Sequence, residues 1–142
     1  MAVNRVSLRR APVRSSSARS VVPPPFRIVV RTERDVVRIC PSGDIDMDTV
    51  GQIRDEIETS TATGARRVVL DLRDVTFLGS MGLCLVLEAD AASREDGWEF
   101  ALIGGPARVQ RIFDLTGARA RLPFLEASQL SALLAAPGDP AA

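Results

Sequence analysis

The sequence predicts a single α/β domain with a mixed, mostly parallel sheet flanked by helices. A length of 142 residues suits one domain with one core. A composition of 46% hydrophobic and 25% charged residues is ordinary for a globular protein. Strand-like and helix-like patterns alternate in the order β-β-α-β-α-β-α-β-α. Such alternation favours parallel strands joined by right-handed crossovers.

The first three elements are a hairpin and a helix. Dense β-branched residues predict strands at 26–31 and 36–40. Arg34 and Asp35 lie between them as a tight turn, so the two strands should pair antiparallel. From 49 to 57 apolar residues recur three and four positions apart, which predicts an amphipathic helix.

The next element is a central strand at 68–72, where four of five residues are apolar. A nearly continuous apolar run is typical of a strand covered on both faces. The remaining predicted elements are a helix from about Met81, a strand at 100–103, a helix from Pro106 to Gly117, a strand at 122–125 and a last helix around 130–134.

The chain ends are predicted to lie outside the domain, which spans 26–135. Residues 1–25 form a predicted disordered Arg/Ser/Pro-rich tail with five arginines and no acid, and 136–142 should be frayed. No apolar stretch suits a secretory signal or a membrane span, so we expect a cytoplasmic protein without membrane insertion. The domain is mildly acidic, which argues against nucleic-acid binding. All 18 basic residues are arginine, which suggests a GC-rich bacterial source.

The composition also limits the chemistry. Histidine and tyrosine are absent, which excludes a Ser-His-Asp relay and a histidine metal centre. Cys40 and Cys84 form no CxxC pair and lie in apolar stretches, so we expect buried reduced thiols. We therefore expect no catalytic residue, metal or cofactor, and a protein that is not an enzyme. Weak nucleotide binding is a minor alternative, although Gly104 and Gly105 belong to no GxGxxG or P-loop motif.

Two turns carry the functional signal. In the first, Gly79 and Gly82 flank Ser80 at the predicted start of a helix, where Ser80 suits the N-cap position. Function in open α/β sheets gathers at such carboxyl ends of strands. The second turn, 43–48, holds three aspartates, which indicate either a helix-entry turn or an acidic patch for an arginine-bearing partner.

Both turns, 43–46 and 69–83, resemble the STAS family, which includes the anti-sigma factor antagonists. The resemblance implies the family fold and binding of an anti-sigma factor kinase of the GHKL ATPase type, which releases a sigma factor for transcription. We expect at most weak homodimerisation. The family pattern assigns partner binding to Asp44, Asp46, Asp74, Gly79, Ser80, Met81, Gly82 and Leu83.

The sequence departs from the family pattern at the phosphorylation site. Switchable members read Asp-Ser-Ser-Gly or Asp-Ser-Thr-Gly, with the phosphoacceptor just before the last glycine. Here that position holds Met81, which has no hydroxyl, and Ser80 is the remaining candidate phosphoacceptor. We therefore expect an antagonist without the usual phospho-switch. The alternative is a STAS adaptor subunit of a lipid-transport ABC complex or a signalling scaffold.

Overall fold

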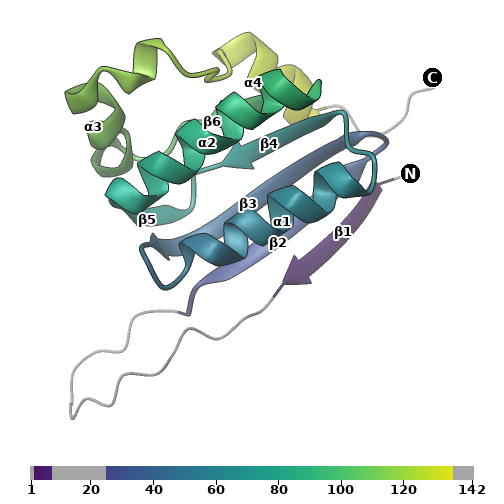
Figure 1. The fold of residues 1–142 in the computed structure, drawn as a ribbon, viewed down its shortest axis with the longest axis horizontal. Coiled ribbons are helices and arrows are strands. Elements are labelled where there is room, and N and C mark those ends of the chain that lie inside the picture. The colour runs from purple at the N-terminus through teal and green to yellow at the C-terminus, as the bar shows by residue number, and fades with distance from the viewer. Residues whose placement is uncertain (1, 8–24, 136–142) are drawn as a thin grey trace.

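Six strands form one mixed sheet in the computed structural model, which describes residues 2–7 and 25–135 (Figure 1). The strands are β1 (Ala2–Ser7), β2 (Arg27–Glu33), β3 (Val36–Ile45), β4 (Arg67–Asp71), β5 (Val75–Leu78) and β6 (Glu99–Ile103). Their order is β1-β2-β3-β4-β6, and β5 pairs with β3 outside this path. The pairs β1·β2 and β2·β3 are antiparallel, whereas β3·β4, β3·β5 and β4·β6 are parallel. The predicted fold class is confirmed.

Helices cover both faces of this sheet. They are α1 (Val50–Ala62), α2 (Ser80–Asp96), α3 (Ala107–Thr116), the 3-10 turn η1 (Ala118–Ala120) and α4 (Ala127–Ala135). Figure 1 shows α1 and α2 side by side across one face, with α4 behind the sheet. Within residues 2–7 and 25–135, no helix is both long and apolar enough to cross a bilayer.

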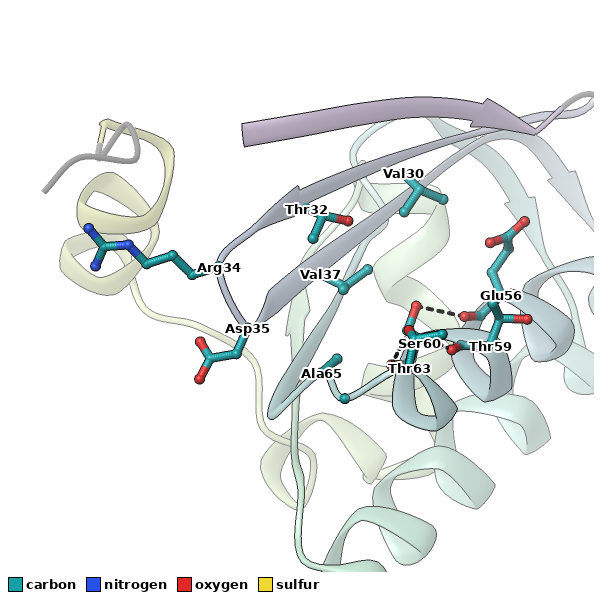
Figure 2. Close-up of a pocket in the computed structure, with 11 residues that line it drawn as sticks. Val30, Thr32, Arg34, Asp35, Val37, Glu56, Thr59, Ser60, Thr63 and Ala65 are labelled. Carbon is teal, nitrogen blue, oxygen red and sulfur yellow. Dashed lines mark hydrogen bonds between the residues drawn. The ribbon is translucent and has the colours of Figure 1, made fainter. Parts of the chain in front are cut away.

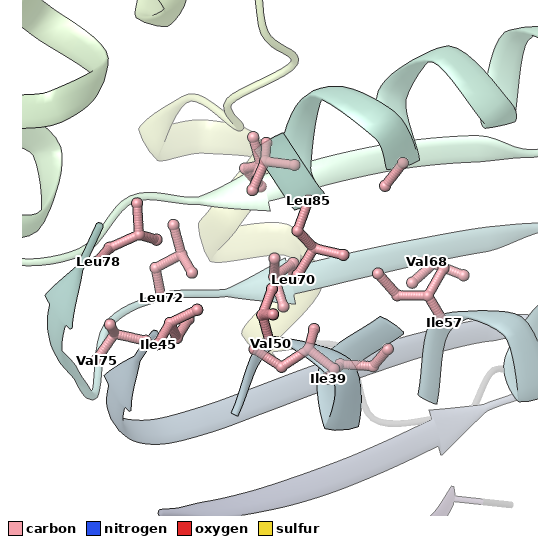
Figure 3. Close-up of a cluster of buried hydrophobic side chains, with 14 of the residues drawn as sticks. Ile39, Ile45, Val50, Ile57, Val68, Leu70, Leu72, Val75, Leu78 and Leu85 are labelled. Atoms are coloured by element: carbon pink, nitrogen blue, oxygen red, sulfur yellow. The ribbon is translucent and has the colours of Figure 1, made fainter. Parts of the chain in front are cut away.

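The core lies mainly between the sheet and the pair α1 and α2. Side chains alternate across a strand, so β4 sends Val68 and Leu70 into the main cluster and Val69 to the opposite face (Figure 3). On that opposite face, Leu130 and Leu133 of α4 pack against Val69 and its neighbours on β6. This double coverage explains the nearly continuous apolar run in the sequence.

Strand β3 is shared by two neighbours along its length. Its residues 36–39 pair with β4, and its residues 43–45 pair with β5. The register shifts between Gly43 and Asp44, and Gly43 has φ +105°, a conformation that favours glycine. This arrangement places the β5–α2 turn beside the carboxyl end of β3.

The structure corrects the predicted elements at two places, 75–78 and 122–125. No strand was predicted at 75–78, but these four residues form β5, which pairs with β3. The predicted strand at 122–125 is only a bridge between Phe124 and Leu102. Pro123 has no backbone N–H to donate, and only its carbonyl and the Leu125 N–H bond to Leu102.

Two further expectations were wrong. Residues 1–25 were predicted to be a disordered tail, but Ala2–Ser7 forms a strand that pairs with β2 from Glu33 to Ile28. The rest of that tail, residues 8–24, and the predicted frayed end at 136–142 lie outside the described residues. Cys84 is exposed and Cys40 only partly buried, so neither thiol is the buried group predicted from its apolar neighbours.

Candidate functional site

The β5–α2 turn is held by its backbone and not by a serine cap. Gly79 is the N-cap residue in extended conformation, and α2 begins at Ser80, one residue earlier than expected. The N-cap has no side-chain hydrogen bond, so the predicted capping role of Ser80 is wrong. The Gly79 N–H donates instead to the Ile45 carbonyl oxygen at 3.4 Å. The Ser80 side chain is left exposed at a helix N-terminus.

The acidic turn between β3 and α1 is organised by its own side chains. Asp46 Oδ1 accepts the Asp48 N–H at 2.9 Å, and the Asp46 carbonyl oxygen accepts the Val50 N–H at 2.9 Å. Thr49 Oγ1 donates to the Asp44 carbonyl oxygen at 2.8 Å. These bonds form the predicted helix-entry turn. The Asp44 carboxylate accepts the Thr76 hydroxyl at 2.5 Å, which ties this turn to β5.

The structure brings together most of the residues predicted to bind a partner. Ile45 pairs with Leu78 in the sheet, so Asp44 and Asp46, on either side of Ile45, are neighbours of the turn 79–83 that follows Leu78. Asp74 precedes β5, where its carbonyl oxygen accepts the Gly43 N–H at 3.2 Å, so it lies close to Asp44. It is apart from residues 79–83, because the four residues of β5 between them span about 13 Å. Gly82 is buried and Leu83 packs against the core. Ser80 and Met81 are therefore the side chains that this turn offers to solvent.

Large apolar side chains are exposed at the same end of the domain. Met47 is 71% exposed, Phe77 52% and Met81 45%. The Phe77 ring lies against the backbone of Gly79, because a Cβ there would come within 3.2 Å of it. The term turn surface is used below for these three residues together with Asp44, Asp46 and Ser80.

Sequence reasoning missed Met47 and Phe77 as site residues. No local signal marked Phe77, since alternation puts it on the same face of β5 as Val75, which is buried. The signal for Met47 was its position between two aspartates in a turn. Exposed apolar groups of this size within a polar rim mark interaction surfaces.

The turn surface has the character of a docking site, because it combines carboxylates with exposed apolar side chains. Among the described residues, no group of three or more His, Cys, Asp or Glu side chains could hold a metal ion. The chain has no histidine to deprotonate Ser80. Carboxylates and apolar side chains at this surface complement a partner that presents arginine or lysine beside apolar groups.

A separate polar depression lies at the other end of α1 (Figure 2). It is bordered by the β2–β3 hairpin and by Glu56 and Ser60 of α1, where the Ser60 hydroxyl donates to the Glu56 carbonyl oxygen at 2.7 Å. Figure 2 shows Arg34 and Asp35 pointing away from Glu56. The charged groups do not converge, so the depression does not resemble a catalytic site.

Known proteins match this chain over most of the domain. The family model described as "Mlab, STAS domain" matches residues 28–136. The anti-sigma-B factor antagonist of Staphylococcus aureus is 23% identical over 94 residues, which are 66% of this chain and 87% of that protein.

Solved structures agree with this match. The crystal structure of an anti-sigma factor antagonist from Mycobacterium paratuberculosis is 27% identical, with a TM-score of 0.62 over 77% of this chain and 94% of that one. The anti-sigma factor antagonist SpoIIAA in its unphosphorylated form is 22% identical, with a TM-score of 0.61 over 77% and 95% of the two chains, a likeness of fold. From the family match over residues 28–136, supported by the shared fold, we conclude that the chain belongs to the STAS domain family.

Proposed function

We propose that this protein is an anti-sigma factor antagonist that binds a GHKL-type anti-sigma kinase through the turn surface and thereby releases a sigma factor. The observation that carries the proposal is the exposure of Met47, Phe77 and Met81 beside the acidic helix-entry turn. The relatives from Staphylococcus aureus and Mycobacterium paratuberculosis, which are named anti-sigma factor antagonists, support it.

The energetics of such a complex would rest on the apolar side chains. Covering exposed apolar surface stabilises a complex by about 25 cal/mol per Å², and a few central residues dominate most interfaces. Met81 is suited to a central position because a flexible thioether adapts to a partner's shape. Asp44 and Asp46 would then set orientation and association rate more than affinity. Binding of this kind requires no chemistry, so we propose a regulator and not an enzyme.

The proposed complex is not switched off by phosphorylation in the usual way. Met81 occupies the usual acceptor position and has no hydroxyl. Ser80 is exposed and begins α2, so a phosphate there would be favoured by the helix N-terminus. The same phosphate would add about −1.5 to −2 charges beside Asp44 and Asp46. We propose that the partner kinase leaves Ser80 unmodified and that the complex is constitutive.

The binding proposal is tested by placing a charge on the turn surface. Met81→Glu should weaken binding at least about tenfold, because it puts a carboxylate into an apolar contact. Leu87→Glu is a matched control, since Leu87 is 44% exposed, close to the 45% of Met81, on the same helix. Leu87 lies six residues after Met81, so it is about 9 Å further along α2 and rotated by about 120° around the helix axis.

The measurement is calorimetric titration of each protein into the purified anti-sigma kinases of the source organism. We expect wild type and Leu87→Glu to bind one of them alike. Equal binding by Met81→Glu, or no binding of any such kinase by wild type, would contradict the proposal.

The absence of a phospho-switch is tested separately. The protein is incubated with the bound kinase and ATP, and its intact mass is measured. We expect no added phosphate. Stoichiometric phosphate on Ser80, removed by Ser80→Ala, would show that the switch has moved by one residue and has not been lost.

A further inference from the structure

The face of the sheet opposite α1 carries an unusual set of side chains. In β2 and β3, Ile28, Val30, Val37 and Ile39 point into the core under α1. Strand alternation therefore turns their neighbours to the other face. These neighbours border a shallow depression together with residues from β4, the β4–β5 turn and α4; its lining includes Arg27, Val29, Arg31, Arg38, Cys40 and Arg73. These six residues are called the open sheet face below.

Two arginines on the open sheet face are directly opposite one another. Arg31 of β2 and Arg38 of β3 are partners in the antiparallel register. Like charges in that relation destabilise a sheet. Opposite charges would be the stabilising choice at this position, so the pair is a feature that the fold itself does not require.

The available carboxylates do not neutralise this face. Asp71 is buried and accepts hydrogen bonds from the Arg73 guanidinium, at 2.7 and 3.0 Å, and from its backbone N–H at 3.1 Å. It also forms an ion pair with Arg38 at 3.5 Å. The hydrogen bond with Asp71 raises the pKa of Arg73, which therefore keeps its charge. Arg27 and Arg31 have no ion pair with any carboxylate among the described residues. Four arginines thus lie on this face with three carboxylates, Glu33, Asp71 and Asp74, which leaves an excess of positive charge.

An apolar stripe separates the arginines into two groups. Val6, Val29 and Cys40 are partners across β1, β2 and β3, so their side chains share this face. Val6 is 54% exposed. Burial, and next the charge of Asp71, raise the pKa of Cys40 to about 11, so its thiol stays neutral and acts as part of the stripe. Arg31 and Arg38 lie on one side of the stripe, and Arg27 lies on the other.

We propose that the open sheet face docks an acidic amphipathic helix of a partner protein. Arg27 and Arg31 are four residues apart on β2, about 13 Å. Positions i and i+7 or i+8 of a helix are about 11 to 12 Å apart, with i+3 and i+4 between them. A helix with carboxylates at the outer positions and leucines at the inner ones therefore matches both arginine groups and the stripe.

Other anionic partners fit this face less well. A nucleic acid would favour continuous positive charge, whereas Asp71, Asp74 and the apolar stripe interrupt it here. A membrane surface favours apolar groups that protrude beyond the basic ones, whereas Val29 and Cys40 are partly buried between long arginines. The site lies on the face opposite α1 and α2, so it goes beyond the proposed function and does not use the turn surface.

The test uses a synthetic fluorescein-labelled helical peptide of 18 residues, with glutamates at i, i+7 and i+8 and leucines at i+3 and i+4, and a scrambled peptide of the same composition. Fluorescence anisotropy is measured with the full chain. We expect wild type to bind the patterned peptide more tightly than the scrambled one, with affinity falling as salt rises. The double variant Arg31→Gln/Arg38→Gln should weaken this binding at least about tenfold.

Two controls separate this site from general charge and from the turn surface. The variant Arg66→Gln/Arg121→Gln removes the same charge from exposed positions off this face, and Met81→Glu alters the turn surface. Both should bind the patterned peptide within about twofold of wild type.

Equal binding of both peptides, or equal loss in Arg66→Gln/Arg121→Gln, would overturn the proposal. So would binding of phosphatidylglycerol vesicles in preference to the peptide. Self-association in sedimentation that Arg31→Gln/Arg38→Gln abolishes would instead assign the face to a second copy of the chain.

Discussion

Substitution of Gly82 by alanine tests whether the turn surface is held in place by close packing beneath it. A Cβ at Gly82 would lie 2.8 Å from Leu78 Cγ and 3.1 Å from Ile45 Cγ2. Both contacts are with buried side chains, one from β5 and one from β3. The added methyl group would therefore be trapped between two strands, and α2 would have to move away from the sheet.

The magnitude follows from two opposing effects. Alanine in place of glycine within a helix stabilises by about 0.5–1 kcal/mol. Inserting a methyl group into a well-packed core costs about 1–3 kcal/mol. We expect the steric effect to win, and Gly82→Ala to lower the free energy of unfolding by about 1–2 kcal/mol.

A matched control isolates the steric effect. Gly51 lies in the first turn of α1, and a Cβ there would meet nothing within 4 Å. Gly51→Ala should therefore raise the free energy of unfolding by about 0.5–1 kcal/mol. Urea denaturation of wild type and both variants, with unchanged m values, measures the two effects. If Gly82→Ala is as stable as Gly51→Ala, the close contact beneath the turn surface does not exist.

Three more predictions rest on the thiols and on the open sheet face. Exposed Cys84, one helical turn after Met81, should react with N-ethylmaleimide at pH 7.5 much faster than Cys40. A bound partner should slow the reaction of Cys84 and leave that of Cys40 unchanged. Peptide mass mapping measures both reactions. The pKa of Cys40 is raised from 9.0 to about 11, so the unfolded chain loses this proton at a lower pH than the folded chain does. The melting temperature should therefore fall between about pH 9 and 11, and it should fall less steeply in Cys40→Ala. Identical slopes for the two proteins would contradict this prediction. Arg31→Thr removes the repulsion with Arg38 and should raise the free energy of unfolding by about 0.2–1 kcal/mol in urea, whereas a loss of stability would mean that the pair is compensated.

The sequence predicted those elements whose patterns reflect burial. Residues 68–72 read as a central strand because both faces of β4 are covered, and that requirement is visible as an apolar run. Strand β5 was missed because only two of its four residues are buried, and its pairing partner is the distant end of β3. Ala2–Ser7 was missed because its pairing with β2 depends on a strand more than twenty residues away.

The sequence located the two turns of the candidate site, but not the exposed apolar side chains beside them. The glycines around Ser80 located the turn, and the aspartates located its neighbour. The exposure of Phe77 depends on which face of β5 meets the core, and the distance of Asp74 from residues 79–83 depends on the length of β5. Both are consequences of tertiary packing that local pattern does not encode.

The division of β3 between two neighbours separates the framework of the sheet from the turn surface. Residues 36–39 hold the sheet together, whereas 43–45 anchor β5 and everything that follows it up to α2. Segments 43–48 and 74–83 therefore form one unit, which the pairing of Ile45 with Leu78 holds together. Exchanging these segments with those of a relative should transplant partner choice onto an otherwise unaltered framework, which is a route by which one architecture diversifies into many signalling pairs.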